Sequence, residues 1–131
     1  CYSVQDGFEG MVAGLIKRLE WRDVYGWTGI GGSLLGCQRI DAKQVGFENI
    51  ARRIREFKLD GLVLIGGFEA FSSICQLKEQ RENFKEFCIP LLCIPATISN
   101  NVPGTNFSIG CDTALNEIVT VFIKLQNEFF V

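Results

Sequence analysis

Apolar residues recur along the chain in two kinds of pattern, and the two alternate. In three segments they stand three or four positions apart, which is the spacing of one face of a helix. The apolar positions of these segments are Val12, Leu15, Ile16 and Leu19, then Phe47, Ile50, Ile54 and Phe57, and finally Leu115, Ile118, Val119, Phe122 and Leu125. The spacing predicts three helices, each with its apolar stripe facing a core.

Two short, continuous apolar runs predict strands that are buried on both faces. The first is Leu62 to Ile65, which ends at Gly66-Gly67, and the second is Ile89 to Ile94, which ends at Pro95. Such runs are typical of parallel strands with helices on both sides. The sequence therefore predicts an α/β fold, with a parallel sheet and helices on both faces.

The segment between these strands predicts one long helix from Phe68 to Phe87. Phe71, Ile74 and Cys75 are expected to face inward. The charged run from Lys78 to Glu82 is interpreted as a solvated face. No internal repeat or linker interrupts the chain, so one domain, or part of one, is the simplest interpretation.

Composition narrows the classes of function. The 131 residues are 47% hydrophobic and 21% charged with a net charge of −2, so an electrostatic surface for nucleic acid or membrane is not expected. No apolar run approaches the roughly 20 residues of a membrane span. A start at Cys1 and an apolar end at Phe129-Phe130-Val131 indicate a piece of a longer polypeptide.

Cysteine and histidine usage excludes several kinds of site. The six cysteines form no CxxC pair and mostly stand among apolar residues, so they are interpreted as reduced thiols, not as a disulfide framework or a zinc site. The chain contains no histidine. Histidine-based catalytic triads and the usual zinc-hydrolase sites are therefore excluded.

The first candidate site is the polar corner from Pro95 to Gly104, where small hydrogen-bonding side chains follow a buried strand. In parallel α/β sheets, ligands bind just beyond the carboxyl ends of the strands. The same residue types also make ordinary capped turns. From the residues alone, both interpretations remain open.

A second candidate site is the glycine-rich segment from Gly29 to Gly36, followed by Arg39. Its exposed backbone N–H groups and the planar guanidinium suit a bound phosphate. Familiar fingerprints fail, because the dinucleotide motif needs glycine where Leu34 stands and the P-loop needs Lys and Ser/Thr at Cys37-Gln38. A flexible loop is the alternative.

Several strings together resemble animal ATP-dependent 6-phosphofructokinase, and more narrowly the C-terminal half of that duplicated enzyme, over about Val4 to Lys124. The strings are Gln5 to Gly10, Gly26 to Gly36, Gly61 to Ala70, Cys88 to Pro90, Ile94 to Gly104, and Asp112 to Asn116. The resemblance implies a partial, Rossmann-like phosphofructokinase fold, with residues 1–131 forming a single partial domain of the regulatory half.

Two departures from the family's catalytic half imply that catalysis is lost here. The family's Gly-Gly-Asp-Gly-Ser turn, which receives ATP phosphates and magnesium, reads Gly66-Gly67-Phe68-Glu69-Ala70. The family's catalytic Thr-Ile-Asp-Asn-Asp reads Thr97-Ile98-Ser99-Asn100-Asn101. Neither serine nor asparagine acts as a general base near neutral pH without an activating partner. We therefore expect no catalytic and no metal-binding residue in this segment.

The resemblance further implies that the segment binds the activator fructose 2,6-bisphosphate. The implied effector-binding residues are Arg39, Thr97, Ile98, Ser99, Asn100 and Asn101. The tail from Phe122 departs from the family, so the site is expected to be incomplete. The parent would be a cytoplasmic glycolytic kinase that uses ATP and magnesium and assembles as a homo- or hetero-tetramer, while the segment itself needs no cofactor.

Two alternatives of other classes remain. In the first, the segment would be an active kinase half that transfers phosphate from ATP to fructose 6-phosphate, which would require a carboxylate at Ser99 or Asn101. In the second, the segment would be a truncated paralogue that serves only as an interaction module, an interpretation that the apolar C-terminal end favours.

Overall fold

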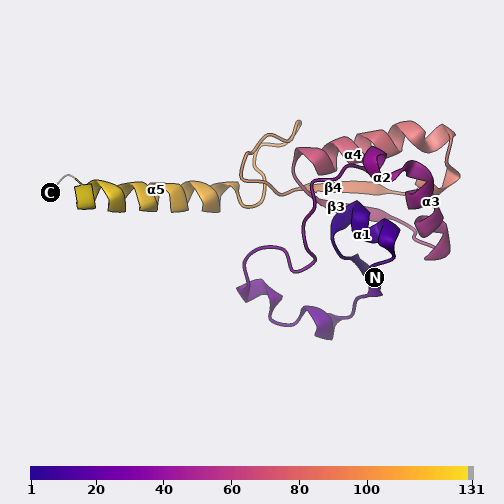
Figure 1. Cartoon of the computed structure of the whole chain (residues 1–131), viewed down its shortest axis with the longest axis horizontal. Coiled ribbons are helices and arrows are strands. Elements are labelled where there is room, and N and C mark those ends of the chain that lie inside the picture. Colours follow the sequence, from indigo (N-terminus) through magenta and orange to yellow (C-terminus); the bar gives the residue numbers. More distant parts are fainter. Residues whose placement is uncertain (130–131) are drawn as a thin grey trace.

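The computed structural model describes residues 1–129, and the Phe130-Val131 part of the apolar end lies outside them. Helices and strands alternate, with two small sheets and short 3₁₀ turns between them (Figure 1). The order is β1 (Tyr2–Val4), α1 (Gly7–Ala13), β2 (Ile16–Arg18), η1 (Trp21–Val24), η2 (Trp27–Gly29), α2 (Ala42–Val45), α3 (Phe47–Glu56), β3 (Leu62–Gly66), α4 (Phe68–Glu79), η3 (Gln80–Glu82), η4 (Lys85–Phe87), β4 (Leu91–Pro95) and α5 (Cys111–Phe129).

The unit β3–α4–β4 forms the centre of the fold. β3 and β4 pair in parallel from Leu62 opposite Leu91 to Gly66 opposite Pro95. α4 connects them and packs against both strands, as Figure 1 shows. The predicted α/β class with parallel strands is confirmed, and both predicted strands are present.

One face of this parallel sheet is open. Val63, Ile65 and Leu92 point away from α4, and 56%, 63% and 56% of their surface is exposed. The prediction that both strands are buried on both faces is therefore wrong for the described part of the chain. The reason is that residues 1–129 supply no second helical layer over this face, although the apolar runs are those of doubly covered strands.

The core lies on the other side of the sheet, where α1, α2, α3 and α4 converge. α3 is packed as its periodicity predicts, since Ile50 is fully buried and Ile54 is 3% exposed. The buried cluster consists of Phe8, Met11, Ala42, Ile50, Ala51, Ile54, Leu77 and Phe87. A buried hydroxyl ties two of these helices together, because Ser73 Oγ accepts a hydrogen bond from the Ala42 amide at 3.1 Å.

The helix predicted over Val12 to Leu19 is not formed. α1 ends at Ala13, because Gly14 adopts a left-handed conformation with φ of 85° and its N–H closes the helix on the carbonyls of Gly10 and Met11. The residues from Ile16 to Arg18 then form β2, which pairs antiparallel with β1. The periodic spacing of apolar residues continues across a backbone that has changed direction.

The segment predicted as a single helix from Phe68 to Phe87 is also divided. α4 begins at Phe68 as predicted but ends at Glu79, and two 3₁₀ turns follow. The Arg81 guanidinium donates to the carbonyls of Phe87 and Ile89, at 2.9 and 3.0 Å. Arg81 is therefore half-buried and holds the connection to β4, whereas the sequence placed it on a solvated face.

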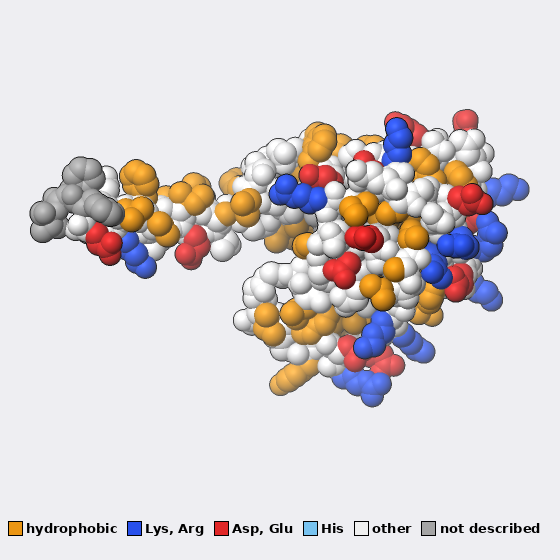
Figure 2. Space-filling model, in the orientation of Figure 1, with side chains coloured by type: hydrophobic (Ala, Val, Ile, Leu, Met, Phe, Trp, Pro, Cys, Tyr) orange, Lys and Arg blue, Asp and Glu red, His pale blue; other side chains and the backbone are white. Residues whose placement is uncertain are grey.

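The last helix, α5, extends away from the body of the molecule (Figure 1). Its large apolar side chains from Leu115 to Leu125 are exposed, and the space-filling view shows apolar side chains on this helix (Figure 2). The prediction that the stripe from Leu115 to Leu125 faces a core is wrong within residues 1–129, because no other element packs over it there. None of the helices in these residues has the length and apolarity that crossing a membrane requires.

Candidate functional site

The ends of the two parallel strands bring two of the sequence motifs together. Gly66 and Pro95 are paired, and each strand leads directly into a turn. A Cβ placed on Gly67 would lie 3.1 Å from the Cβ of Thr97. The glycine turn that begins α4 and the polar corner that follows β4 are therefore in direct contact at the carboxyl end of the sheet, where α/β folds hold ligands.

Backbone hydrogen bonds fix the start of the corner. The Ala96 amide donates to the Gly66 carbonyl at 2.8 Å, which extends the sheet by one bond. On the other side, the Thr97 amide donates to the Ile109 carbonyl and the Ile109 amide to the Pro95 carbonyl, at 3.0 and 2.9 Å. Thr97 is thus held between β3 and the segment that returns to α5.

Ser99 and Asn101 present their side chains to solvent. Both residues are exposed, and within residues 1–129 neither side chain forms a hydrogen bond with another protein group. The Ser99 amide donates to Thr97 Oγ1 at 3.2 Å, which orients the turn. Ile98, which stands between Thr97 and Ser99, is 73% exposed. The free hydroxyl and amide suit recognition of a polar ligand.

Asn100 has a different task from its neighbours. It adopts a left-handed conformation with φ of 48°, which asparagine tolerates better than most residues. Its Oδ1 accepts from the Ser108 amide at 2.9 Å, and its Nδ2 donates to the Asn106 carbonyl at 3.2 Å. Both ends of this amide hold the loop from 100 to 108 closed, so Asn100 shapes the corner from within.

The glycine-rich segment and Arg39 are not joined to the corner. The segment is anchored near α1, where the Asp6 amide donates to the Leu35 carbonyl at 2.8 Å. Arg39 is exposed and forms no salt bridge among the described residues. Figure 1 shows both loops beyond the same end of the sheet. The structure brings together Thr97 to Asn101, but it records no hydrogen bond or ion pair that joins Arg39 to them.

The chemistry available at the corner is neutral hydrogen bonding. Phe68, which stands beside Gly67, is 48% exposed and offers no metal ligand. The described residues contain no group of three or more histidine, cysteine, aspartate or glutamate side chains that could hold a metal ion. Since Ser99 and Asn101 carry no charge, the corner has hydrogen-bonding groups but no general base.

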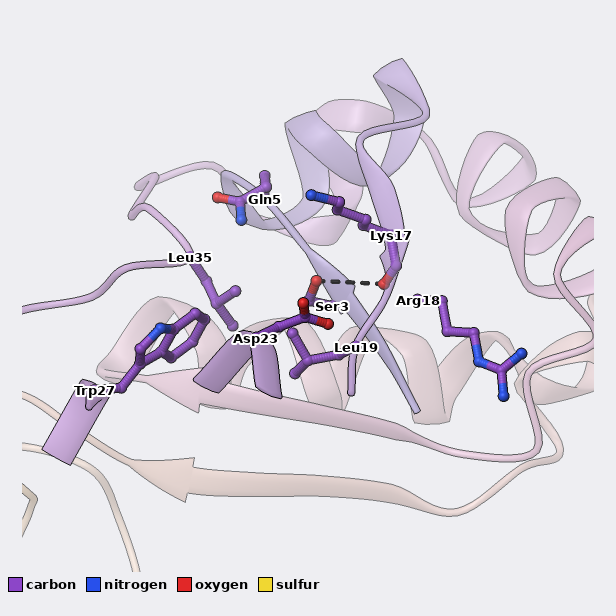
Figure 3. A pocket seen from close by; sticks show the side chains of 8 residues that line it. All are labelled: Ser3, Gln5, Lys17, Arg18, Leu19, Asp23, Trp27 and Leu35. Carbon is purple, nitrogen blue, oxygen red and sulfur yellow. Dashed lines mark hydrogen bonds between the residues drawn. The ribbon is translucent and has the colours of Figure 1, made fainter. Parts of the chain in front are cut away.

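A separate cavity of about 210 Å³ lies at the small antiparallel sheet (Figure 3). Lys17 and Gln5 lie on one side and the Trp27 ring on the other, whereas the Arg18 side chain points away in this view. Ser3 Oγ donates to the Lys17 carbonyl at 3.3 Å. The lining residues are Ser3, Gln5, Lys17, Arg18, Leu19, Asp23, Trp27 and Leu35. No sequence motif marks this cavity, because short separate segments contribute its lining.

Comparison with known proteins points to one family. A family model described as phosphofructokinase matches residues 1–129. The chain is 54% identical to the muscle-type ATP-dependent 6-phosphofructokinase of Homo sapiens and 50% identical to the ATP-dependent 6-phosphofructokinase of Schistosoma mansoni, each over 123 residues and 94% of the chain. It spans 16% of the length of both relatives. A phosphofructokinase structure from Saccharomyces cerevisiae matches 97% of the chain at 39% identity with a TM-score of 0.94, and 17% of that structure is covered.

Proposed function

The chain belongs to the phosphofructokinase family, and from that premise we propose that it is a regulatory segment of an ATP-dependent 6-phosphofructokinase. The segment, residues 1–131, is a partial domain of the C-terminal half. It binds fructose 2,6-bisphosphate and does not itself transfer phosphate.

The observation that carries this proposal is the neutral, solvent-facing corner at the end of β4. A kinase active site for a sugar hydroxyl needs a group that takes the proton, and Ser99 and Asn101 cannot do so. Both side chains are nevertheless free to form hydrogen bonds with a polar ligand. An aromatic ring at Phe68 also replaces the small acid that would hold magnesium in a catalytic half. Loss of the charges together with retention of the turn favours binding without chemistry.

The predicted site residues take different roles in this proposal. Ser99 and Asn101 contact the sugar bisphosphate through their side chains, and Thr97 and Ile98 contribute through the backbone or the Thr97 hydroxyl. Asn100 acts as a positioning residue, since both ends of its side-chain amide already bind the loop. Arg39 pairs with a phosphate once ligand or neighbouring chain draws its exposed loop toward the corner.

The parent protein follows from the family. We propose a cytoplasmic glycolytic enzyme that uses ATP and magnesium in another part of its chain and assembles as a homo- or hetero-tetramer. Activation then requires that fructose 2,6-bisphosphate bind the active state of this oligomer more tightly than the inactive state. Further phosphate contacts come from residues outside this segment.

Calorimetric titration with fructose 2,6-bisphosphate tests the site. The protein is a full-length phosphofructokinase that carries this segment, with Ser99→Ala and Asn101→Ala combined. Each lost hydrogen bond weakens binding by about 1 kcal/mol, so the dissociation constant is expected to rise roughly tenfold or more.

A control variant, Asn83→Ala, changes an exposed asparagine in the turn between α4 and β4, at the opposite end of β4 from the corner, and is expected to leave the affinity unchanged. An unaltered dissociation constant in the Ser99/Asn101 double variant would remove these two residues from the site.

A further inference from the structure

Asp6 stands at the start of α1 in an unusual backbone conformation. Its φ is 54° and that of Gly7 is 58°, so two successive residues are left-handed. The turn is held against α1, because the Gly10 amide donates to the Asp6 carbonyl at 3.2 Å and a Cβ placed on Gly10 would overlap the Gln5 carbonyl oxygen. An aspartate at this position usually caps the helix, but the Asp6 side chain accepts no bond from the first turn. The strained conformation therefore needs another explanation than capping.

Asp6 contacts the end of the glycine-rich segment with both its backbone and its side chain. The Asp6 amide donates to the Leu35 carbonyl at 2.8 Å. The carboxylate lies against Gly36, where an added Cβ would overlap Asp6 Oδ1 and lie 3.0 Å from Asp6 Cγ. Gly36 has a φ of 77°, and Ser33 Oγ donates to its carbonyl at 2.9 Å. Asp6 therefore fixes the position of the last two residues of this segment.

Arg39 lies in a short span between two anchors. The first is the contact of Asp6 with Leu35 and Gly36, and the second is the start of α2, where the Ala42 amide donates to Ser73 Oγ in α4 at 3.1 Å. Among residues 1–129, none of the residues 37–40 forms a hydrogen bond. Arg39 is three residues from Gly36 and three from Ala42, so its Cα stays within about 11 Å of each anchor.

The second anchor also ties this span to the polar corner. Ser73 belongs to α4, and the same helix begins beside Gly67, whose added Cβ would lie 3.1 Å from the Cβ of Thr97. The end of the span at Ala42 is therefore fixed relative to the corner. A span fixed at one end alone can swing in any direction. The first anchor, at Asp6, consequently determines where the guanidinium of Arg39 can reach.

We propose that Asp6 is a positioning residue that acts through Leu35 and Gly36 to set where the Arg39 guanidinium meets a phosphate of the sugar bisphosphate. Asp6 itself touches no ligand. A guanidinium binds phosphate best through two parallel N–H bonds, so a displaced backbone at Arg39 loses geometry as well as energy. This inference rests on the proposed function, because it takes Arg39 as a phosphate ligand.

Gly36→Ala, in a full-length phosphofructokinase that carries this segment, tests the contact. The added methyl group overlaps the Asp6 carboxylate and displaces the loop, so the calorimetric dissociation constant for fructose 2,6-bisphosphate is expected to rise at least about fivefold. Gly26→Ala is the matched control, since Gly26 has a φ of 80° and an added Cβ there meets no atom within 4 Å. It adds the same backbone strain and is expected to change the dissociation constant less than about twofold. Equal changes in the two variants would overturn the proposal.

A variant at position 6 tests the same contact from the other side. Asp6→Gly suits the left-handed backbone but removes the carboxylate beside Gly36, and it is expected to weaken binding about threefold. Asp6→Gly combined with Gly36→Ala puts a methyl group where the carboxylate was and keeps the amide that donates to Leu35. The combined variant is expected to bind within about twofold of the unaltered protein. A combined loss as large as the sum of the two single losses would contradict the proposal.

A double-mutant cycle with Arg39→Ala distinguishes positioning from general destabilisation. If Asp6 acts through Arg39, then Gly36→Ala and Asp6→Gly have no further effect on affinity once the guanidinium is absent. A further loss of the same size in the Arg39→Ala background would overturn the proposal. An unaltered protein that binds no fructose 2,6-bisphosphate, or an Arg39→Ala variant with unchanged affinity, would remove the proposed site and this inference with it.

Discussion

At the corner after β4, neighbouring residues of similar chemistry have different tasks. The Asn100 amide closes the loop from 100 to 108, while the side chains of Ser99 and Asn101 face solvent. Sequence reasoning placed all three in one binding motif and could not separate them, because the distinction depends on a left-handed backbone at Asn100. The type of residue was predictable, whereas its hydrogen-bond partner was not.

Thiol reactivity also differs residue by residue. Burial raises the pKa of the Cys93 thiol, and the nearby Cys75 adds to the effect. Since the thiolate is the reactive form, Cys93 is expected to react with iodoacetamide near pH 8 several-fold more slowly than the exposed Cys88. Peptide mapping by mass spectrometry measures both rates in one sample. Equal rates would show that β4 does not shield Cys93 as described.

At the scale of elements, the sequence predicted what local periodicity determines. α3, β3 and β4 form where the apolar pattern places them. α3 buries its stripe in the core cluster, and the two strands pack one face against the same cluster. The helices predicted over Val12 to Leu19 and over Phe68 to Phe87 were wrong because a single local feature ends the helix in each segment. Gly14 reverses the chain after α1, and the Arg81 guanidinium stabilises a non-helical connection after α4. Neither event changes the spacing of apolar residues.

Arg81 is expected to stabilise the connection between α4 and β4. Arg81→Ala removes two charge-assisted hydrogen bonds to backbone carbonyls and leaves those acceptors without their partner. The free energy of unfolding is expected to fall by about 2 kcal/mol in urea titrations. Arg52→Ala removes an exposed arginine with a single long contact of 3.4 Å and serves as the control, with a change below about 0.5 kcal/mol. A similar small change at Arg81 would mean that its two bonds do not hold the turn.

For the molecule as a whole, packing is uneven. The buried cluster lies on one side of the sheet, while the other face and α5 are exposed. The sequence indicated core-facing stripes correctly as apolar surfaces but could not show where their partners lie, since an apolar stripe has the same pattern whether its partner belongs to the same segment or to another. The parallel pairing of β3 with β4 creates the contact between the corner and the glycine turn, whereas no recorded hydrogen bond or ion pair joins Arg39 to the corner.

Removal of α5 tests whether the buried cluster is stable without this exposed helix. A chain that ends at Gly110 keeps the buried cluster and the bonds that anchor Thr97, so its free energy of unfolding is expected to match that of the whole chain within about 0.5 kcal/mol. Its solubility is expected to rise, because the exposed stripe is gone. Urea titration, monitored in the near ultraviolet by signals other than those of tryptophan, measures the free energy of unfolding. A chain shortened to residue 90 lacks β4 and is expected not to fold. A large loss on removal of α5 alone would show that the helix stabilises the body.

The contact between Gly67 and Thr97 limits how this protein can evolve. Any side chain at position 67 would press on the Thr97 methyl or hydroxyl, since even a Cβ would lie only 3.1 Å from its nearest carbon. A larger residue at position 67 therefore requires the Thr97 side chain to shift by a few tenths of an ångström or to be replaced by a smaller one, although the two positions are thirty residues apart. The turn and the corner are accordingly expected to tolerate substitution best when positions 67 and 97 change together.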